Sequence, residues 1–597
     1  MKSLFFILLC SSLSFSALEV PMVKMNNLAK DNTWLNLLHY NKNTKKSSIL
    51  NKDFFLSPLG KKNPMSELQA TIYAYSQPIK DESHAVCRFP ARYKWLSKHI
   101  ELQNYQTIQH QCKLLYKWNI LQDVDSLSIV FVSGFLDNPA SAFGHSFLKI
   151  NKVNASNNNL FDTTISYGAK LPEKYTMLSY MYNGVTGGYN ATYSDKYYYM
   201  DDIVYSNQEF REMWEYKLAL NKDEVNLLLL HLWELRGIEF QYYFFNRNCG
   251  YKVSELLELV YNEDLRGKAY VWYAPIETFF RLRDMGKRQN RSIFKNIQYI
   301  PSKQQNIYAQ YHGFSDIDKG IINRSIKLES VVEVEQILNQ SNQIKILDFI
   351  LAYYTYKNTN KSKEEQLSNV FQKKVLLKRL SLPIYQYNMN VPEDKQDITQ
   401  SDKSSYVSLS YKKKNISFSY APFVIESVGY NQYGGDILKI FNTTIGLKND
   451  DIYLEQLDIV KIRRLKSEQI PFDVENPYSW SLHLGMENKS NMDYFLDLGI
   501  GYSWNFTQYI KYYTMLHTSV HSQNQHYRVN PNMGMHIAFD KFRMNIDYGV
   551  ENIKYKSIFN EKFSIETQYK VDSAFSVFLM IEKKETKTIE FGLKWYL

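Results

Sequence analysis

The chain has 597 residues, a length that suggests two to four domains. Its 48 Tyr and 34 Phe bring the aromatic content to 15%, which is typical of β-rich, membrane-interface or carbohydrate-facing surfaces. The formal net charge of +10 is spread along the chain, without zinc-finger spacings, a basic helix or a Gly-rich phosphate loop. This pattern argues against nucleic acid as a partner and favours anionic lipid or cell-wall material.

The first residues have the layout of a cleaved secretory signal peptide. Lys2 precedes an apolar run from Leu4 to Leu9, and small residues follow up to Ala17. We therefore expect residues 1–17 to be absent from the mature protein. No later segment has the roughly 18 continuous apolar residues of a membrane-spanning helix. If the protein spans a membrane, a closed β-barrel is the remaining solution.

Removal of the signal peptide leaves three cysteines in an oxidising compartment. Cys87 and Cys112 lie in one helical-looking segment, so the most economical disulfide joins these two. Cys249 then stays a thiol, which is a liability in such a compartment unless it is buried or used.

Two regions of the chain show helical periodicity. Residues 18–120 carry apolar residues at three- and four-residue spacing, as in Met65 to Ser76, and form an accessory region. Residues 301–400 are helical and charged, and we interpret them as a linker.

Residues 121–300 have a mixed pattern. Buried-strand runs at 126–134, 145–153 and 160–169 are followed by an aromatic and Gly-rich stretch at 180–205, which we expect to form tight turns and a groove. A capped helix is predicted at 221–237, and a short strand at 239–245 then leads straight to Cys249.

From about residue 401 to 597 the hydrophobic period becomes two. In Tyr494 to Phe506 the apolar residues Leu496, Leu498 and Ile500 share one face, and Asp497 lies on the other. About a dozen such segments, joined by short polar turns, indicate an antiparallel outer-membrane β-barrel. The alternative is a soluble β-sandwich or a lipid-binding barrel, but the charges on the polar face and the aromatic strand ends favour the membrane version.

Cys249 stands where a strand gives way to a helix. A helix start stabilises a thiolate, and the amides of Cys249 and Gly250 could bind the oxyanion formed during acyl transfer. A cysteine nucleophile also needs a base, and His145 at the head of a strand is well placed to present an imidazole. The alternative is that neither residue is catalytic, so that Cys249 is a structural cysteine and His145 is only a polar residue at a strand end.

A third group usually orients the base. If the hairpin turn covers 152–159, His145 lies opposite Ser166, which brings Ser166 and Thr164 within reach and makes Asp162 a charged candidate. A one-residue slip would exchange the two faces. Tyr167 either lines the site or fills the core.

These segments together resemble the Lnb-type N-terminal periplasmic domain family. The resemblance is carried by "SAFGHSFLKI", "DTTISYGA", "EYKLAL" and "FNRNCGYKVSELL", and flanking pieces such as "CRFPARYKWL" and the barrel resemble the longer proteobacterial members. This family is related to permuted papain-like enzymes, which include NlpC-type peptidases and lecithin:retinol acyltransferase. The resemblance implies that Cys249 is the nucleophile, that His145 is the base, and that the pair Asn248 and Cys249 is a nucleophile motif of the acyltransferase branch. The family's prototype N-acylates lipoproteins and is anchored by membrane helices, and this sequence departs from it in lacking such a helical segment.

We therefore expect a multidomain α+β protein, with a permuted papain-like thiol domain, helical flanking regions and a C-terminal antiparallel β-barrel. The predicted activity is a Cys-His acyltransferase or hydrolase, without metal or cofactor, that acts on phospholipid or lipoprotein from the periplasmic side of the outer membrane. Two alternatives stay open. One is a cell-wall peptidase or amidase with the same dyad, and the other is a non-catalytic binding or assembly module.

Overall fold

The computed structural model describes residues 20–41, 44–102, 111–134, 136, 144–153, 159–267, 272–359, 361–362, 369–385, 387–388, 391–392, 395, 397–413, 415–431, 434–448, 451–472, 477–488, 491–523, 527–553, 559–583 and 587–597. The predicted signal peptide at 1–17 lies outside these residues. The chain divides into two compact units. Unit 1 comprises 1–127, 148–196 and 220–268, and unit 2 comprises 128–147, 197–219 and 269–597. No helix in the described part of the chain is long and apolar enough to cross a membrane.

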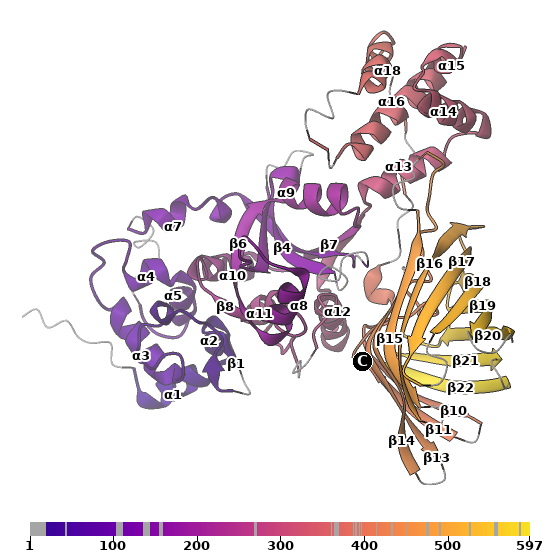
Figure 1. Ribbon diagram of the computed structural model, residues 1–597. Coiled ribbons are helices and arrows are strands. Elements are labelled where there is room, and N and C mark those ends of the chain that lie inside the picture. The colour runs from indigo at the N-terminus through magenta and orange to yellow at the C-terminus, as the bar shows by residue number, and fades with distance from the viewer. Residues whose placement is uncertain are drawn as a thin grey trace, which may run out of the picture. The chain divides into compact units, whose positions relative to one another are not determined.

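The N-terminal part of unit 1 is helical, in agreement with the sequence prediction (Figure 1). Pro64 at the first turn and the side chain of Asn63, which accepts the amides of Met65 and Ser66, start α3. The predicted disulfide between Cys87 and Cys112 is present. The main helices of this part are α1 (Met22–Lys30), α2 (Asn32–Leu37), α3 (Pro64–Tyr75), α4 (Ala85–Arg88), α5 (Pro90–Leu96) and α7 (Lys113–Lys117).

The rest of unit 1 combines strands with three helices. Strand β4 (His145–Lys152) enters this unit at Leu148 and pairs with β5 (Thr163–Ala169), while β6 (Tyr189–Tyr197) pairs with β8 (Phe240–Tyr242). The helices are α8 (Met177–Thr186), α10 (Lys222–Glu234) and α11 (Cys249–Tyr261). The predicted capping box of α10 is present, because Asn221 and Glu224 exchange side-chain hydrogen bonds with each other's amides.

The stretch at 180–205 differs from the prediction of turns and a groove. It contains most of α8, the nine-residue strand β6, the short helix α9 (Tyr198–Asp202) and the start of a π-helical turn, η4 (Ile203–Gln208). The glycines at 184, 187 and 188 suggested turns. Instead, Gly187, at φ +80°, ends α8 in the left-handed conformation.

Unit 2 begins with a small antiparallel sheet and a helical layer. Strand β3 (Val124–Val132) pairs from Ser128 onward with β7 (Met213–Leu218), which pairs with β9 (Phe294–Ile300), and α12 (Glu277–Gln289) follows. The predicted helical linker forms a cluster around Tyr353 and Phe349, which also buries Ile470 from a barrel loop. Its helices are α13 (Lys303–His312), α14 (Asp316–Leu328), α15 (Val332–Glu335), α16 (Gln340–Lys357) and α18 (Val370–Leu380).

The C-terminal region is a closed antiparallel β-barrel. Within the described ranges, twelve strands follow one another around the ring, and the pairing of β11 with β13 closes it, while the short β12 continues β11. The strands are β10 (Tyr406–Lys412), β11 (Asn415–Ala421), β12 (Phe423–Ile425), β13 (Ile437–Lys448), β14 (Asp451–Arg464), β15 (Ser479–Asn488), β16 (Met492–Asn505), β17 (Ile510–His521), β18 (Tyr527–Phe539), β19 (Phe542–Ile553), β20 (Phe559–Lys570), β21 (Phe575–Lys583) and β22 (Lys587–Tyr596). The predicted count of about twelve is confirmed.

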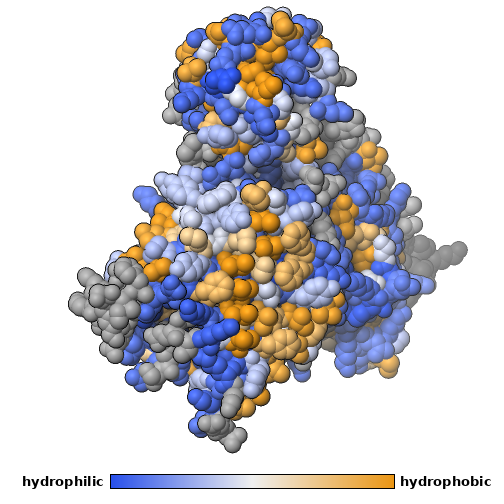
Figure 2. All heavy atoms as spheres, turned by 90° about the vertical axis from the view of Figure 1, so that its right-hand side faces the viewer, coloured by the Kyte–Doolittle hydropathy of each residue, from blue (hydrophilic) through white to orange (hydrophobic). Residues whose placement is uncertain are grey.

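The barrel turns apolar side chains outward and polar ones inward. Leu498 and Ile500 on β16 are exposed, whereas Asp493 at the start of the same strand is buried. Figure 2 shows apolar residues gathered on this side of the molecule. The interior holds ion pairs, such as Lys594 with Glu426 at 2.8 Å. This arrangement is that of a membrane-spanning barrel and excludes a barrel with an apolar interior.

Exposed aromatic residues lie along the barrel rim at which the chain enters and leaves it, from β15 to β22. An even number of strands puts the start of β10 and the end of β22 at the same rim. Exposed rings gather at the strand ends and turns of this rim: Tyr478, Trp504, Phe506, Tyr509, Phe539, Phe542, Tyr569 and Trp595. Aromatic side chains of this kind mark the lipid–water interface.

Candidate functional site

Cys249 is the first residue of α11. The side chain of Asn248 caps the helix, since its Oδ1 accepts the Tyr251 amide at 3.3 Å and its Nδ2 donates to the Phe244 carbonyl at 2.9 Å. The cysteine remains a thiol and is 4% exposed. A 13-residue helix directs the positive end of its dipole to its first turn, which favours a thiolate. Gly250, the predicted oxyanion donor, is the next residue of that turn.

A buried charged network follows Cys249 along the same helix. Lys252, one turn on, donates to Glu255 at 2.5 Å, and its ammonium group lies 3.6 Å from the centre of the Phe240 ring. Burial lowers the pKa of Lys252 to about 8, although the charge of Glu255 opposes this shift. Glu255 also accepts from Arg266 and from Nδ1 of His39. The network therefore fixes α11 against the N-terminal helical region.

Two histidines extend the network across unit 1. Nε2 of His39 lies 3.1 Å from Nε2 of His231, and Nδ1 of His231 lies 3.0 Å from Glu234. Glu234 in turn accepts the amides of Ala91 and Arg92 at the start of α5. The row Glu255, His39, His231 and Glu234 therefore connects α11 with α10 and with the start of α5.

Tyr167, one of the candidate site residues, interacts electrostatically with Cys249. It lies on β5, is fully buried, and its hydroxyl has no hydrogen-bond partner among the described residues. Burial raises the pKa of Tyr167, and the charges of Glu255 and Cys249 raise it further. The hydroxyl consequently stays protonated and can donate. The amino-acid pattern left Tyr167 undecided between a site residue and a core residue.

The other predicted residues of β5 have different surroundings. Leu148 is opposite Ile165, so the predicted register, which put His145 opposite Ser166 and hence Leu148 opposite Thr163, was wrong by two residues. The connection between β4 and β5 includes a short helical turn at 159–161, which the expected hairpin turn over 152–159 did not include. Because side chains alternate along a strand, Thr164 and Ser166 lie on the face opposite Tyr167.

The three candidate orienters of the base are all buried. The Thr164 hydroxyl donates to the Lys196 carbonyl at 3.3 Å. Asp162 pairs with Lys149 at 3.4 Å and accepts the Lys152 amide at 3.1 Å, which occupies its carboxylate. The Ser166 hydroxyl has no hydrogen-bond partner within the described residues.

His145 starts β4 and belongs to unit 2. Gly144 before it has φ +81°, and a Cβ there would lie 2.7 Å from the Val132 carbonyl oxygen, so only glycine fits. The imidazole packs against Tyr205 with ring centres 5.7 Å apart and the ring planes tilted by 35°, and Tyr205 lies in the π-helical turn. Such turns are frequent at functional sites. The pairing of His145 with Cys249, which lies in unit 1, stays a prediction.

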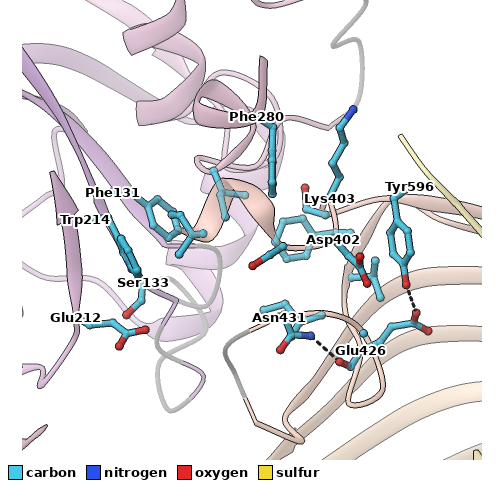
Figure 3. Close-up of a pocket in the computed structure, with 18 residues that line it drawn as sticks. Phe131, Ser133, Glu212, Trp214, Phe280, Asp402, Lys403, Glu426, Asn431 and Tyr596 are labelled. Atoms are coloured by element: carbon cyan, nitrogen blue, oxygen red, sulfur yellow. Dashed lines mark hydrogen bonds between the residues drawn. The ribbon is translucent and has the colours of Figure 1, made fainter. Parts of the chain in front are cut away.

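Unit 2 contains a pocket between its small sheet and the entry rim of the barrel (Figure 3). Phe131 and Phe280 supply apolar walls, and Glu212, Asp402 and Glu426 are its acids. Each acid is paired with a lysine: Glu212 with Lys395, Asp402 with Lys570, and Glu426 with Lys594. With its charges neutralised in this way, the pocket suits an uncharged, mainly apolar group.

One cluster in the barrel has potential metal ligands. Ligand atoms of Glu487, Asp493 and His521 lie within 4.8 Å of one another. The Asp493 carboxylate accepts from His521 at 2.8 Å and from the amides of Ser522 and Gln523 at 3.1 Å each. These hydrogen bonds account for the arrangement without a cation.

Sequence comparison identifies three matched regions. Residues 115–282 match the family described as the Lnb N-terminal periplasmic domain. Residues 26–99 and 418–597 match two domains of unknown function, DUF7843 and DUF7840. A search of curated proteins found no match.

Among solved structures, similar chains include three outer-membrane proteins. The KdgM porin (TM-score 0.23, 8% identity) and the NanC porin (0.22, 8%) each cover 32% of this chain, and 98% and 99% of their own. Omp33 of Acinetobacter baumannii covers 33% of this chain and 99% of its own, at TM-score 0.21 and 9% identity. These similarities are weak, and strand pairing alone establishes the barrel. Residues 115–282 thus resemble the Lnb N-terminal periplasmic domain family, and the chain ends in a twelve-stranded antiparallel β-barrel with an apolar outer face.

Proposed function

We propose that this protein is a periplasmic cysteine-dependent acyltransferase or acyl hydrolase, exported by its N-terminal signal and anchored in the outer membrane by its barrel. Its thiol domain would have the permuted papain-like fold, and its substrate would be the acyl ester of a phospholipid or lipoprotein. The main support is Cys249, a buried thiol at the start of a capped helix, inside an Lnb-type domain.

The first half-reaction is acyl capture. His145 takes the Cys249 proton, and the thiolate attacks the ester carbonyl, so that a carbon–sulfur bond forms. The carbon–oxygen bond then breaks, and the departing alcohol takes the proton back from His145. The products are a lysolipid and an acyl thioester on Cys249.

The second half-reaction releases the acyl group. Water or an amine attacks the thioester, His145 accepts its proton, and Cys249 regains that proton as it leaves. In both halves the carbonyl oxygen becomes an oxyanion, for which the Gly250 amide and the neutral Tyr167 hydroxyl are suitable donors. Because burial keeps Tyr167 protonated, this donor does not depend on pH in the physiological range.

The test uses the full chain in proteoliposomes that contain phospholipid with a labelled acyl chain. Wild type should release or transfer the label, and Cys249→Ala should lower this rate by at least about a thousandfold, because the nucleophile is lost. Ser254→Ala, a small change farther along the same helix, is the matched control and should keep the rate. Each variant should retain the Cys87–Cys112 disulfide as evidence of folding.

Two results would contradict the proposal. One is acyl release that is equal in wild type and Cys249→Ala. The other is release of muropeptides from purified cell wall that depends on Cys249 while lipid stays intact, which would establish the peptidase alternative instead.

A further inference from the structure

Helix α8 exposes an apolar face. Leu178 is 80% exposed and Tyr182 is 69% exposed, and Met181 and Val185 beside them are also exposed. The four residues have the spacing i, i+3, i+4 and i+7, so they form one continuous stripe along the ten-residue helix. A surface helix normally turns such a stripe toward the core. Here the stripe faces away from unit 1.

The opposite face of α8 is fixed to the segment that leads into Cys249. Gly184 packs so closely on Phe244 that a Cβ there would lie 2.2 Å from the ring, and its carbonyl accepts the Phe244 amide at 2.8 Å. The Phe244 carbonyl in turn accepts from Asn248, the cap of α11. Whatever binds the exposed stripe is therefore coupled through three residues to the helix start at Cys249.

The helix is formed before any partner arrives. Thr176 and Ser179 make a capping box at its start, and Gly187 ends it in the left-handed conformation. An apolar face on a preformed, capped helix needs no folding step on binding, so little of the burial energy is lost to ordering.

The chemistry of the stripe and its surroundings fits a lipid surface. Tyr182 and the exposed Tyr175 are the amphipathic aromatics that settle at the lipid–water interface, and the exposed Lys174 just before the helix complements anionic headgroups. The same chain contains a membrane-spanning barrel, which keeps a bilayer tethered to unit 1. A short helix with these residues lies in the interface rather than across the membrane.

We propose that α8 is a membrane-docking helix, which inserts Leu178, Met181, Tyr182 and Val185 into the lipid–water interface and so holds the Cys249 helix start at the lipid surface. The docking of α8 on lipid does not depend on the proposed acyl-transfer reaction. Its consequence, that bilayer lipid is the acyl donor, rests on the proposed function.

The docking test places a fluorescent probe on the helix in the full chain. Leu178→Cys in a Cys249→Ala background is labelled with an environment-sensitive fluorophore and reconstituted in vesicles with brominated phospholipid. Lys222→Cys, at the exposed start of α10, is the control. The probe at 178 should be quenched several-fold more than the probe at 222. Equal quenching at the two positions would overturn docking, as would a dimer that Leu178→Gln converts to monomers.

An activity test separates docking from chemistry. Leu178→Gln combined with Tyr182→Gln should lower acyl release from vesicle lipid by about tenfold or more, since two apolar side chains no longer enter the interface. Hydrolysis of a short water-soluble ester should be unchanged. If vesicle activity were retained, bilayer lipid would not be delivered through α8. If Cys249→Ala kept full acyl release while the probe at 178 was still quenched, docking would stand and the proposed function would fail.

Discussion

The barrel and unit 1 place their apolar side chains in opposite directions. On β16, Leu498 and Ile500 face outward and Asp493 is buried, whereas on α11 Leu256 and Leu257 are buried. The difference follows from the solvent, because lipid accepts apolar groups that water rejects. Helix α8 is an exception in unit 1, because its apolar residues Leu178 and Tyr182 are exposed, as the outer residues of the barrel are.

Buried charges are a feature that the two regions share. Arg92 and Glu67 in unit 1 are fully buried and 2.8 Å apart, and Lys594 and Glu426 in the barrel are equally enclosed. A buried pair contributes little net stability, but removal of one partner leaves a charge without compensation. The first prediction applies this rule to unit 1.

Arg92→Met should destabilise unit 1 by about 3–5 kcal/mol, because it leaves the Glu67 carboxylate buried without its guanidinium. Amide hydrogen exchange of α3 and α5 in the full chain measures this loss. Lys94→Met is the control, since its partner Asp223 is 71% exposed and that pair is worth less than about 1 kcal/mol. Equal losses of stability in the two variants would show that the burial of an ion pair does not determine how much its removal destabilises unit 1.

Leu498→Arg should destabilise the barrel by about 2–4 kcal/mol, because it puts a charge on the lipid-facing side in the middle of β16. Ile452→Arg is the matched control near a strand end, where the cost falls to about 0–1 kcal/mol. Urea unfolding in vesicles, read from the heat-dependent shift in gel mobility, compares the two. A soluble barrel would tolerate both changes equally.

Unit 1 should lose stability as the pH falls below about 6.5. Burial lowers the pKa of His39 to about 3, so below its ordinary value the unfolded chain binds a proton that the folded chain does not. The free energy of unfolding should fall by about 2 kcal/mol between pH 7 and pH 5. Hydrogen exchange of α11 should show it, and His39→Gln should flatten the dependence. If stability still fell as steeply with pH in His39→Gln, another titrating group would be responsible for the effect.

The barrel was predictable because its signal is local. The period of two in 494–506 and in the last strand directly reflects which side chains meet lipid, and the strands formed as predicted. The disulfide was predictable for a different reason, since three cysteines leave one economical pairing.

Long-range features of the site were not predictable. Glu255 and His39 are 216 residues apart, and no periodicity links them. The register of β4 with β5 was wrong because the connection contains a helical turn. Helix α8 was missed because its glycines suggest turns, although Gly184 is required by the close approach of Phe244.

The most direct test of the proposed chemistry is to look for the acyl group on Cys249 itself. Full-length protein from phospholipid vesicles is digested, and the peptide that contains Cys249 is examined by mass spectrometry before and after neutral hydroxylamine. The account predicts an acyl thioester on Cys249 that hydroxylamine removes and that Cys249→Ala lacks. Acyl release in full, with Cys249 unmodified throughout and the same rate in Cys249→Ala, would contradict it.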